Sequence, residues 1–462
     1  MNRTTRRVIA GVSVLLVLLA VTTTWWPPAP RESTVVDSVE IAERMTDADP
    51  MRMVEAHLPA EYVGSSPEVV AERVAADPLL AMERSGARPD PDSPNPTEAA
   101  FAALVTGMSA EDSTAPGDVY QRLPRDVADW LAVVFPGVVG NLAGAPFENR
   151  VTANRIRLAA SVAESTYWPG PDRPWHDERE PRADFQRVID GGHRLVYLDP
   201  LANDGQGSWV ELVGDLSTAR HVGVLVPGGS AFISSDNFTR YSDRAGSFVD
   251  AAGGDLAMLV WAGSPFPSGW IQEAGSSWAA DAAPRLAEFL ADLRRQVGGD
   301  TTITLAGHSY GGAVVGMTET YDIDVDRVMH IASAGAGYGV SGPRDYTSPC
   351  RTRYDLMAPG DPIGYVQDVP GFTGLGHGVE VADMPGVLRL VTGSLPDDPQ
   401  ALDDVNRTLG SLGITGKEIG GIHAHSEVFI PNSDAWSNML AVFTGEEPRL
   451  LTRQPPALPG CD

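Results

Sequence analysis

The segment Gly307-His308-Ser309-Tyr310-Gly311-Gly312 holds the residues best suited to covalent chemistry in this chain of 462 residues. It has the pattern G-x-S-x-G, in which a serine occupies a sharp turn between a strand and a helix, and small neighbours leave room for that turn. The apolar residues 302–306 predict a buried strand before it, and the small residues 312–317 predict a helix after it. Ser309 is therefore the candidate nucleophile. The alternative is a glycine-rich turn that serves packing only.

A serine hydroxyl needs a neighbouring base to take its proton, and in this turn motif an acid and then a histidine follow the serine along the chain. Asp361 comes just after a predicted strand at 353–357, in a Gly-Asp-Pro turn, where a carboxylate could orient an imidazole. Aspartate is also common in ordinary turns. Asp355, which lies inside the same strand, is the alternative acid.

The base should come from near the end of the chain. His425 is the first choice because it lies in a predicted loop between the last strand and a closing helix at 434–443. His423, two residues earlier, and His377 are the alternatives. The spacing of His423 and His425 could suit a metal pair, but no carboxylate or cysteine cluster accompanies them.

Acyl transfer also needs two backbone N–H groups that stabilise the developing oxyanion. The amide of Tyr310, directly after the nucleophile, is expected to be one. The other should come from the loop Pro227-Gly228-Gly229-Ser230, with Gly229 as the predicted donor and Ser230 as the alternative. The segment 263–270 is predicted either to wall the pocket or to form a plain surface loop.

Short apolar runs separated by helical patterns indicate the elements that must position these residues. Apolar strands that alternate with helices are typical of an α/β fold, in which a mostly parallel sheet has helices on both faces. The predicted strands are 194–199 and 209–213 (a pair), 221–226, 256–261, 301–306, 327–332, 353–357 and 387–391, with a helix near 277–297.

The first part of the chain reads differently. Residues 31–115 form a predicted helical region, interrupted by a linker at 88–96 that has four prolines in nine residues. Within that region, Ser66-Pro67-Glu68 has the character of a helix start. Residues 116–192 are predicted to be helical, and to lead into or cap a catalytic domain at 193–462.

Residues 1–30 predict an export signal. Arg3, Arg6 and Arg7 precede an uncharged stretch from Val8 to Trp26, which as a helix is about as long as the hydrocarbon core of a membrane is thick. An uncleaved signal anchor is favoured over a cleaved signal peptide. The rest of the chain is then extracytoplasmic, anchored to the membrane or secreted.

The net charge and the number of cysteines exclude several kinds of partner and one kind of metal site. The chain has 34 basic and 61 acidic residues and a net charge of -27, which argues against nucleic acid and against a polybasic membrane surface. Membrane contact is expected through the N-terminal segment only. The two cysteines, Cys350 and Cys461, exclude a Cys-rich zinc site. In an oxidising compartment they can form a disulfide, with two separate buried thiols as the alternative.

Several stretches of the chain, together with the serine, acid and histidine described above, resemble the alpha/beta-hydrolase superfamily, and within it a family of bacterial domains of unknown function. The resemblance covers roughly residues 115–445 and is carried by 140–146 with 153–156, by 221–228, by 307–312, and by a histidine loop and final helix at 425–445. It implies Ser309, Asp361 and His425 as a catalytic triad. The chain departs from the family at Gly228-Gly229-Ser230, which replaces bulkier residues.

The sequence thus predicts an exported serine hydrolase that cleaves an ester-like bond, in a carboxylic ester, a lipid or a thioester, through an acyl-enzyme. The substrate would be a small molecule or a lipid ester, and this chemistry requires no metal or organic cofactor. Two alternatives remain: an acyltransferase with the same fold, and a catalytically silent envelope protein that keeps the fold for binding.

Overall fold

The computed structural model describes residues 60–77, 80–81, 120, 123–167, 181–361, 363, 376–395, 419 and 424–461. The predicted signal segment 1–30, the proline-rich linker 88–96 and His423 lie outside the described residues. No helix within the described ranges is both long enough and apolar enough to cross a membrane.

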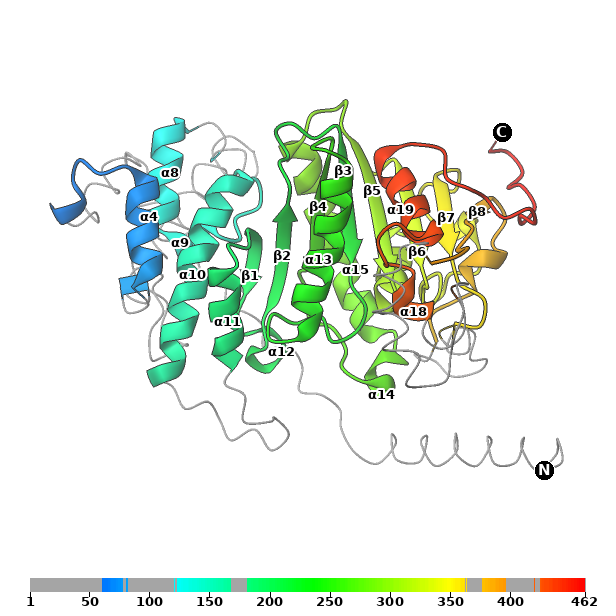
Figure 1. The fold of residues 1–462 in the computed structure, drawn as a ribbon, viewed down its shortest axis with the longest axis horizontal. Coiled ribbons are helices and arrows are strands. Elements are labelled where there is room, and N and C mark those ends of the chain that lie inside the picture. The colour runs from blue at the N-terminus through cyan, green and yellow to red at the C-terminus, as the bar shows by residue number, and fades with distance from the viewer. Residues whose placement is uncertain are drawn as a thin grey trace, which may run out of the picture.

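A sheet of eight strands runs through the described part of the chain in the order β1-β2-β4-β3-β5-β6-β7-β8 (Figure 1). The strands β3 to β8 are parallel, and β2 is antiparallel to both of its neighbours. The predicted, mostly parallel sheet is confirmed. The strands are β1 Leu195–Asp199, β2 Ser208–Val213, β3 His221–Val226, β4 Leu256–Ala262, β5 Thr302–His308, β6 Arg327–Ile331, β7 Thr352–Leu356 and β8 Val387–Arg389.

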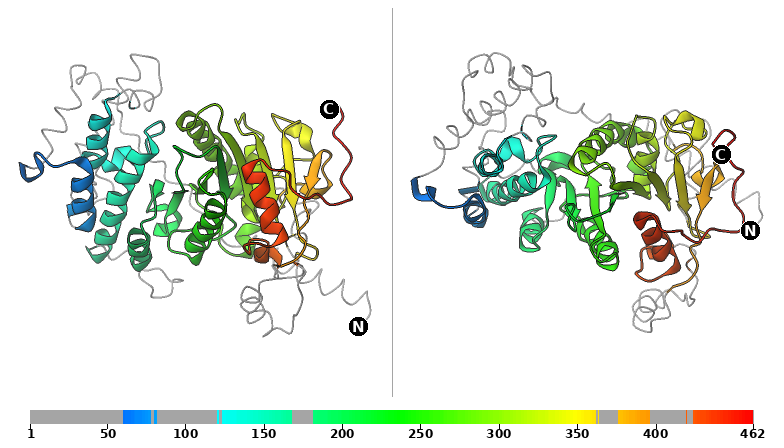
Figure 2. Two further views of the ribbon diagram at one scale, coloured as in Figure 1. Left: turned by 45° about the horizontal axis from the view of Figure 1, so that its top comes forward. Right: turned by 90° about the horizontal axis from the view of Figure 1, so that it is seen from above.

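Helices cover both faces of this sheet, which is why strands such as β4 are buried at every residue. Helices α13 (Asp236–Ala251) and α19 (Asp434–Thr444) lie on one face, and α15 (Ser277–Gln296) lies on the other (Figure 2). Helix α16 (Tyr310–Thr318) packs against α15 and β5. Shorter helical turns are η1 Ala60–Tyr62, α12 Ala202–Gly205, α14 Trp270–Glu273, η2 Pro343–Asp345, η4 Val381–Asp383 and α18 Ala424–Glu427.

A helical layer stands beyond the β1 edge of the sheet (Figure 1). Its long helix, α10, packs along β1, and α4 and α8 pack on α10. The predicted helix start at Ser66 is present: its Oγ accepts a hydrogen bond from the Val69 amide at 3.5 Å, and Pro67 occupies the first turn. The layer consists of α4 Pro67–Ala76, α8 Arg125–Val134, α9 Pro136–Val139, α10 Phe147–Tyr167 and α11 Pro181–Asp190.

Buried polar side chains fasten this layer to the sheet. Asn154 donates from Nδ2 to the carbonyls of Gly140 (2.7 Å) and Leu195 (3.1 Å). Arg150 forms a buried ion pair with Asp292 of α15. Buried polar groups of this kind are stable only when paired. The family-like stretches 140–146 and 153–156 therefore have a structural role, joining α10 to β1 and α15.

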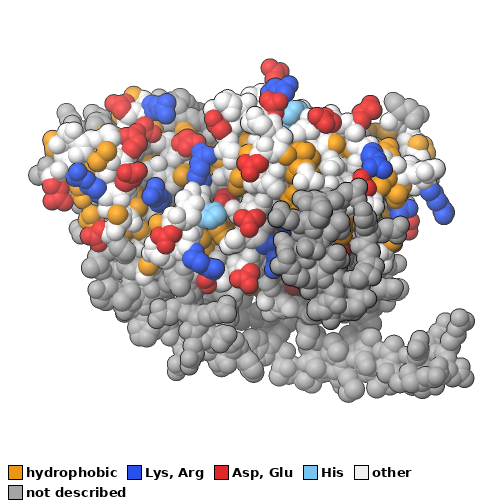
Figure 3. Space-filling model, viewed as in Figure 1, with side chains coloured by type: hydrophobic (Ala, Val, Ile, Leu, Met, Phe, Trp, Pro, Cys, Tyr) orange, Lys and Arg blue, Asp and Glu red, His pale blue; other side chains and the backbone are white. Residues whose placement is uncertain are grey.

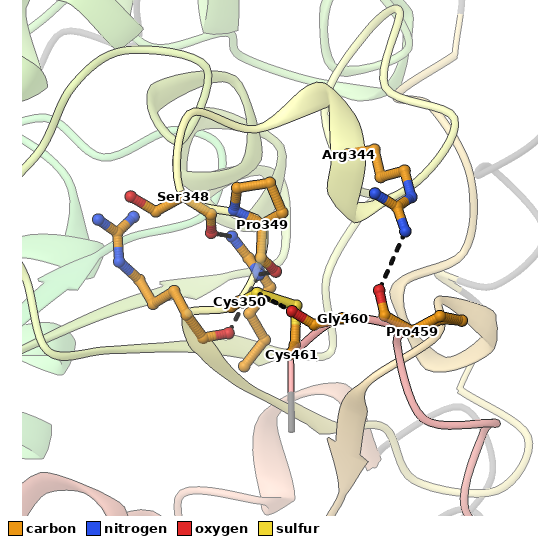
Figure 4. Close-up of a disulfide and its surroundings, with 9 residues drawn as sticks. Arg344, Ser348, Pro349, Cys350, Pro459, Gly460 and Cys461 are labelled. Carbon is orange, nitrogen blue, oxygen red and sulfur yellow. Dashed lines mark hydrogen bonds between the residues drawn. A yellow bond between two sulfur atoms is a disulfide. The ribbon is translucent and has the colours of Figure 1, made fainter.

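Cys350 and Cys461 are joined by a disulfide, with their Cα atoms 5.1 Å apart and a sequence separation of 111 (Figure 4). A second contact supports the same junction, because Arg344 donates from Nη2 to the carbonyl of Pro459 at 3.0 Å. The end of the described chain is thereby held against the loop that precedes β7.

The charged side chains of this acidic chain are mixed on the face drawn in Figure 3. Lys and Arg side chains stand singly among Asp and Glu side chains there, without a continuous basic patch. Such a mixed surface is typical of a solvated face.

Candidate active site

Ser309 occupies the sharp turn between β5 and α16. Its backbone has φ 55° and ψ −125°, a conformation that costs a non-glycine residue about 1–3 kcal/mol. The surrounding structure holds it there: the Ser309 amide donates to the Ile331 carbonyl at 3.0 Å, and its own carbonyl accepts from Ala334 at 2.9 Å. The turn therefore presents the serine at the end of the strand, as the motif predicts.

Close backbone contacts explain the glycines on both sides of the serine. A Cβ atom at Gly307 would lie 2.4 Å from the Gly311 carbonyl oxygen, and a Cβ at Gly311 would lie 2.3 Å from the Pro227 carbonyl oxygen. Gly228 borders the serine directly, because a Cβ there would lie 3.3 Å from Ser309 Oγ. Glycine is required at 307 and 311 to admit the turn itself.

His425 and Asp361 are brought together at the same edge of the sheet. His425 Nδ1 lies 3.1 Å from both carboxylate oxygens of Asp361. Asp361 is 5% exposed, and its Oδ1 also accepts the Ile363 amide at 2.9 Å. Donation from Nδ1 leaves Nε2 as the unprotonated, basic nitrogen. His425 lies on the one-turn helix α18 rather than in the predicted loop, because residues 424–427 close a turn before α19.

The alternative acid and one alternative base have other surroundings. Asp355 is buried within β7, and no hydrogen bond joins it to His425 in the described structure. Burial raises the pKa of Asp355 to about 7. His377 is buried and donates from Nε2 to the Glu273 carbonyl at 2.7 Å. His423, the other alternative, is outside the described residues.

Two backbone amides near the serine have no partner among the described residues, those of Tyr310 and Gly229. Both were the predicted oxyanion donors. The neighbouring amides are engaged: Gly228 donates to the Tyr241 hydroxyl at 2.9 Å, and Ser230 donates to the Pro267 carbonyl at 2.8 Å. The alternative donor, Ser230, is therefore already occupied. The bond to Pro267 also places the segment 263–270 beside this loop.

A buried hydrogen-bonded chain that the sequence did not indicate connects the parts of this site. Tyr241, on α13, accepts from Gly228 and pairs with His308 Nδ1 at 2.5 Å. On the other side, His308 Nε2 lies 2.8 Å from the His425 carbonyl oxygen. The polarity is consistent along the chain: Tyr241 donates to Nδ1, and Nε2–H donates to the carbonyl. Burial holds the pKa of His308 well below its usual range, which keeps this ring neutral.

Glu273 is a second residue that sequence reasoning missed. It ends α14, and its carboxylate lies against Gly229 of the predicted oxyanion loop. Burial raises the pKa of Glu273, while a hydrogen bond from the Gly269 backbone and the charge of His425 act in the opposite direction. No cluster of three or more potential metal ligands occurs in the described ranges.

Part of the chain matches a known protein family. Residues 202–369 match the model of a family described as alpha/beta hydrolase. The match begins before β2 and ends after Asp361, so it includes the serine turn. The domain has an alpha/beta-hydrolase fold.

The relatives of this alpha/beta-hydrolase domain are distant. Two uncharacterized proteins of Mycobacterium tuberculosis, from strains CDC 1551 and H37Rv, are each 25% identical to it over 298 residues. The alignment covers 58% of this chain and 42% of each relative, so the chain spans less than half the length of the curated proteins it matches.

Solved structures of alpha/beta hydrolases resemble it as well. The dienelactone hydrolase-like promiscuous phosphotriesterase P91 from metagenomic libraries is 17% identical, with a TM-score of 0.30, over 52% of this chain and 92% of that one. The poly(3-hydroxybutyrate) depolymerase LpqC from Bordetella parapertussis is 14% identical, with a TM-score of 0.29, over 57% and 94%. Acyl-protein thioesterase 2 from Zea mays is 12% identical, with a TM-score of 0.26, over 44% and 97%.

Proposed function

We propose that this protein is a serine hydrolase that cleaves an ester-like bond through Ser309, His425 and Asp361. The observation that carries the proposal is the hydrogen-bonded pair of His425 and Asp361, which lies at the sheet edge where Ser309 occupies its strained turn. A serine in such a turn, followed by an acid and a histidine whose Nδ1 is bonded to that acid, has the groups that acyl transfer requires.

In the first step, His425 Nε2 takes the proton of Ser309 as Oγ attacks the carbonyl carbon. Asp361 accepts from Nδ1–H, so it holds the ring and stabilises the imidazolium that forms. Ser309 Oγ makes no hydrogen bond to a described residue in the structure, and His425 Nε2 likewise has no partner there. The hydroxyl is therefore free to rotate toward the ring when a substrate is bound.

The tetrahedral intermediate carries its negative charge on the former carbonyl oxygen. The amides of Gly229 and Tyr310 are the donors proposed for this oxyanion, because they lie beside the serine and donate to no described residue. His425 then gives its proton to the leaving alcohol or thiol. Water, activated by the same ring, releases the acid from the acyl-enzyme.

The proposal includes export, on the basis of residues 1–30. Arg3, Arg6 and Arg7 followed by the uncharged segment 8–26 are expected to direct the domain out of the cytoplasm. A β-lactamase fused after residue 30 should protect a bacterial host from ampicillin. A fusion with residues 8–26 deleted serves as the control, and equal sensitivity of both strains would contradict export.

Covalent labelling tests the catalytic proposal. A fluorophosphonate probe, which needs an activated serine, should label the full-length wild-type chain and fail to label Ser309→Ala. Asp361→Asn should slow the labelling by roughly 10³–10⁴-fold, because the imidazole loses the acceptor that fixes its tautomer. Circular dichroism checks that the variants are folded.

The outcomes separate the alternatives. Absence of labelling in the wild type would contradict the hydrolase and leave a silent binding protein. Labelling with release of free acid from an ester supports hydrolysis. Transfer of the acyl group to an added alcohol in preference to water would instead favour the acyltransferase.

A further inference from the structure

The carboxylate of Glu273 lies against Gly229, whose amide is the proposed oxyanion donor. A Cβ atom at Gly229 would lie 2.1 Å from Glu273 Oε1 and 2.6 Å from its Cδ, so the side chain occupies the space that any larger residue at 229 would need. The reaction proposed above uses the Gly229 amide as an oxyanion donor, and Glu273 has no part in that reaction. Its position therefore requires another explanation.

Hydrogen bonds hold the backbone around Glu273, so the fold determines where its side chain begins. His377 donates to the Glu273 carbonyl at 2.7 Å, and the Glu273 amide donates to Gly269 at 3.1 Å. The oxyanion loop is tied to the same segment, since the hydroxyls of Ser230 and Ser268 are 3.2 Å apart. The loop and the backbone of Glu273 are thus held near each other.

The charge of this carboxylate is incompletely compensated. No salt bridge involves Glu273 in the described structure, and its side chain is half-buried. The opposite charge that reaches it comes from His425 when that ring is protonated. A half-buried carboxylate without a fixed cation favours a ligand that brings one.

A bound substrate defines where that cation would be. When the carbonyl oxygen accepts from the Gly229 amide, the substituent on the acyl carbon next to the carbonyl is near the Gly229 backbone and hence near Glu273. An ammonium group there would form a charge-assisted hydrogen bond with the carboxylate. An alkyl group in the same place would remove water from the carboxylate without supplying an opposite charge.

We propose that Glu273 makes this site selective for esters that carry a cationic group beside the scissile carbonyl, such as aminoacyl esters. This inference rests on the proposed function, because it assumes that an acyl group binds between Ser309 and Gly229. Glu273 acts as a specificity-determining residue.

Two covalent probes that differ in one group test this selectivity. Diphenyl (1-aminoethyl)phosphonate carries an ammonium group where diphenyl isopropylphosphonate carries a methyl group. In both cases Ser309 Oγ forms a bond to phosphorus, its proton goes to His425, and phenoxide leaves. Labelling rates of the full-length chain are measured at about pH 6.5, where an α-amino group with a pKa of about 7.7 is mostly protonated.

The wild type should react faster with the ammonium probe, and Glu273→Gln should lower the ratio of the two rates by about 10-fold or more. Glu288→Gln, at an exposed position of α15, is the matched control and should keep the wild-type ratio. An unchanged ratio in Glu273→Gln, or faster labelling of the wild type by the isopropyl probe, would overturn the selectivity.

A fluorophosphonate probe without an amino group distinguishes a failure of the charge selectivity from a failure of the proposed function. If it labels Ser309 while Glu273→Gln leaves the phosphonate ratio unchanged, the charge selectivity is wrong and the serine hydrolase stands. If neither it nor the phosphonates label the wild type, the proposed function fails, and the inference about Glu273 fails with it.

Discussion

Two aspartates six positions apart show how surroundings decide what a carboxyl group can do. Asp361 follows β7 and meets His425 Nδ1 at 3.1 Å, where a charged carboxylate gains a partner. Asp355 is buried inside β7, beside His330 in the strand register. Because burial disfavours its charged form, the pKa of Asp355 rises to about 7. The same residue type is thus suited to catalysis at one position and is a titrating core group at the other.

This difference predicts a pH dependence of stability. Asp355 has a folded-state pKa of about 7, above its unfolded value of about 3.9, so folding retains a proton between these values. Its contribution is therefore fully present below about pH 4 and is lost as the pH rises through about 7, by at most about 1.4 kcal/mol per pH unit. Urea unfolding of the wild type and Asp355→Asn at about pH 4.5 and 7.5 measures it. The wild type should lose more stability than the variant, and equal losses would contradict the assignment.

At the scale of elements, one buried chain of hydrogen bonds joins four segments: α13, the oxyanion loop, the serine turn and α18. Tyr241 of α13 holds the oxyanion loop through Gly228 and the serine turn through His308. His308 in turn holds the backbone of α18 at His425. Arg244, stacked 4.0 Å from the centroid of the Phe429 ring, packs α13 against the segment after α18. The proposed base, nucleophile and oxyanion loop are therefore held by one hydrogen-bonded network.

Removing the Tyr241 hydroxyl should reduce catalysis as well as stability. Tyr241→Phe leaves the Gly228 amide and His308 Nδ1 buried without their partner, which costs about 1–3 kcal/mol for each group. Because both groups border Ser309, we expect kcat to fall by about 10-fold or more, with a smaller change in KM. Ester hydrolysis measured well below the unfolding temperature checks this.

The matched control is Tyr346→Phe. The Tyr346 hydroxyl is also buried and donates to the Ala336 carbonyl at 2.9 Å, but it belongs to the segment near the disulfide. The Tyr346→Phe variant should have a lower stability than the wild type and keep the wild-type kcat. If both variants lose kcat equally, Tyr241 has a general structural role only.

At the scale of the whole molecule, the two ends of the parallel strands hold different groups of residues. The carboxyl ends of the parallel strands hold the serine turn, Asp361 and the oxyanion loop. At the amino ends of the strands, Cys350 precedes β7 and is bonded to Cys461. Arg353 secures the same loop, donating to the carbonyls of Ser348 and Pro349 and pairing with buried Glu319. The amino ends of the strands, away from the proposed catalytic groups, thus hold the end of the described chain.

Loss of the disulfide should therefore weaken the fold and spare the chemistry. A cross-link across 111 positions contributes about 4–5 kcal/mol in the chain-entropy model, so the double variant Cys350→Ala and Cys461→Ala should unfold at a clearly lower urea concentration. Below that concentration its fluorophosphonate labelling rate should equal that of the wild type. An unchanged unfolding midpoint would show that the bond does not stabilise the protein.

The sequence alone determined the succession of strands and the position of the serine turn. Both depend on local patterns: β-branched runs predict strands within one or two residues of β3, β4 and β6, and the glycines at 307 and 311 are required by contacts inside the turn. For Asp361 and His425, the sequence predicted only that an acid and then a histidine should follow the serine along the chain.

Tertiary structure decided the rest, because it depends on which distant segments the parallel crossovers bring to one edge. Tyr241 and Glu273 carry no motif, and they reach the site only because α13 and α14 follow β3 and β4 at the same sheet edge as Ser309. The stretch 140–156, conspicuous in sequence, has a packing role because α10 ends up against β1. Local sequence selects the shape of a turn, whereas the neighbours of a side chain are selected by the fold of the whole chain.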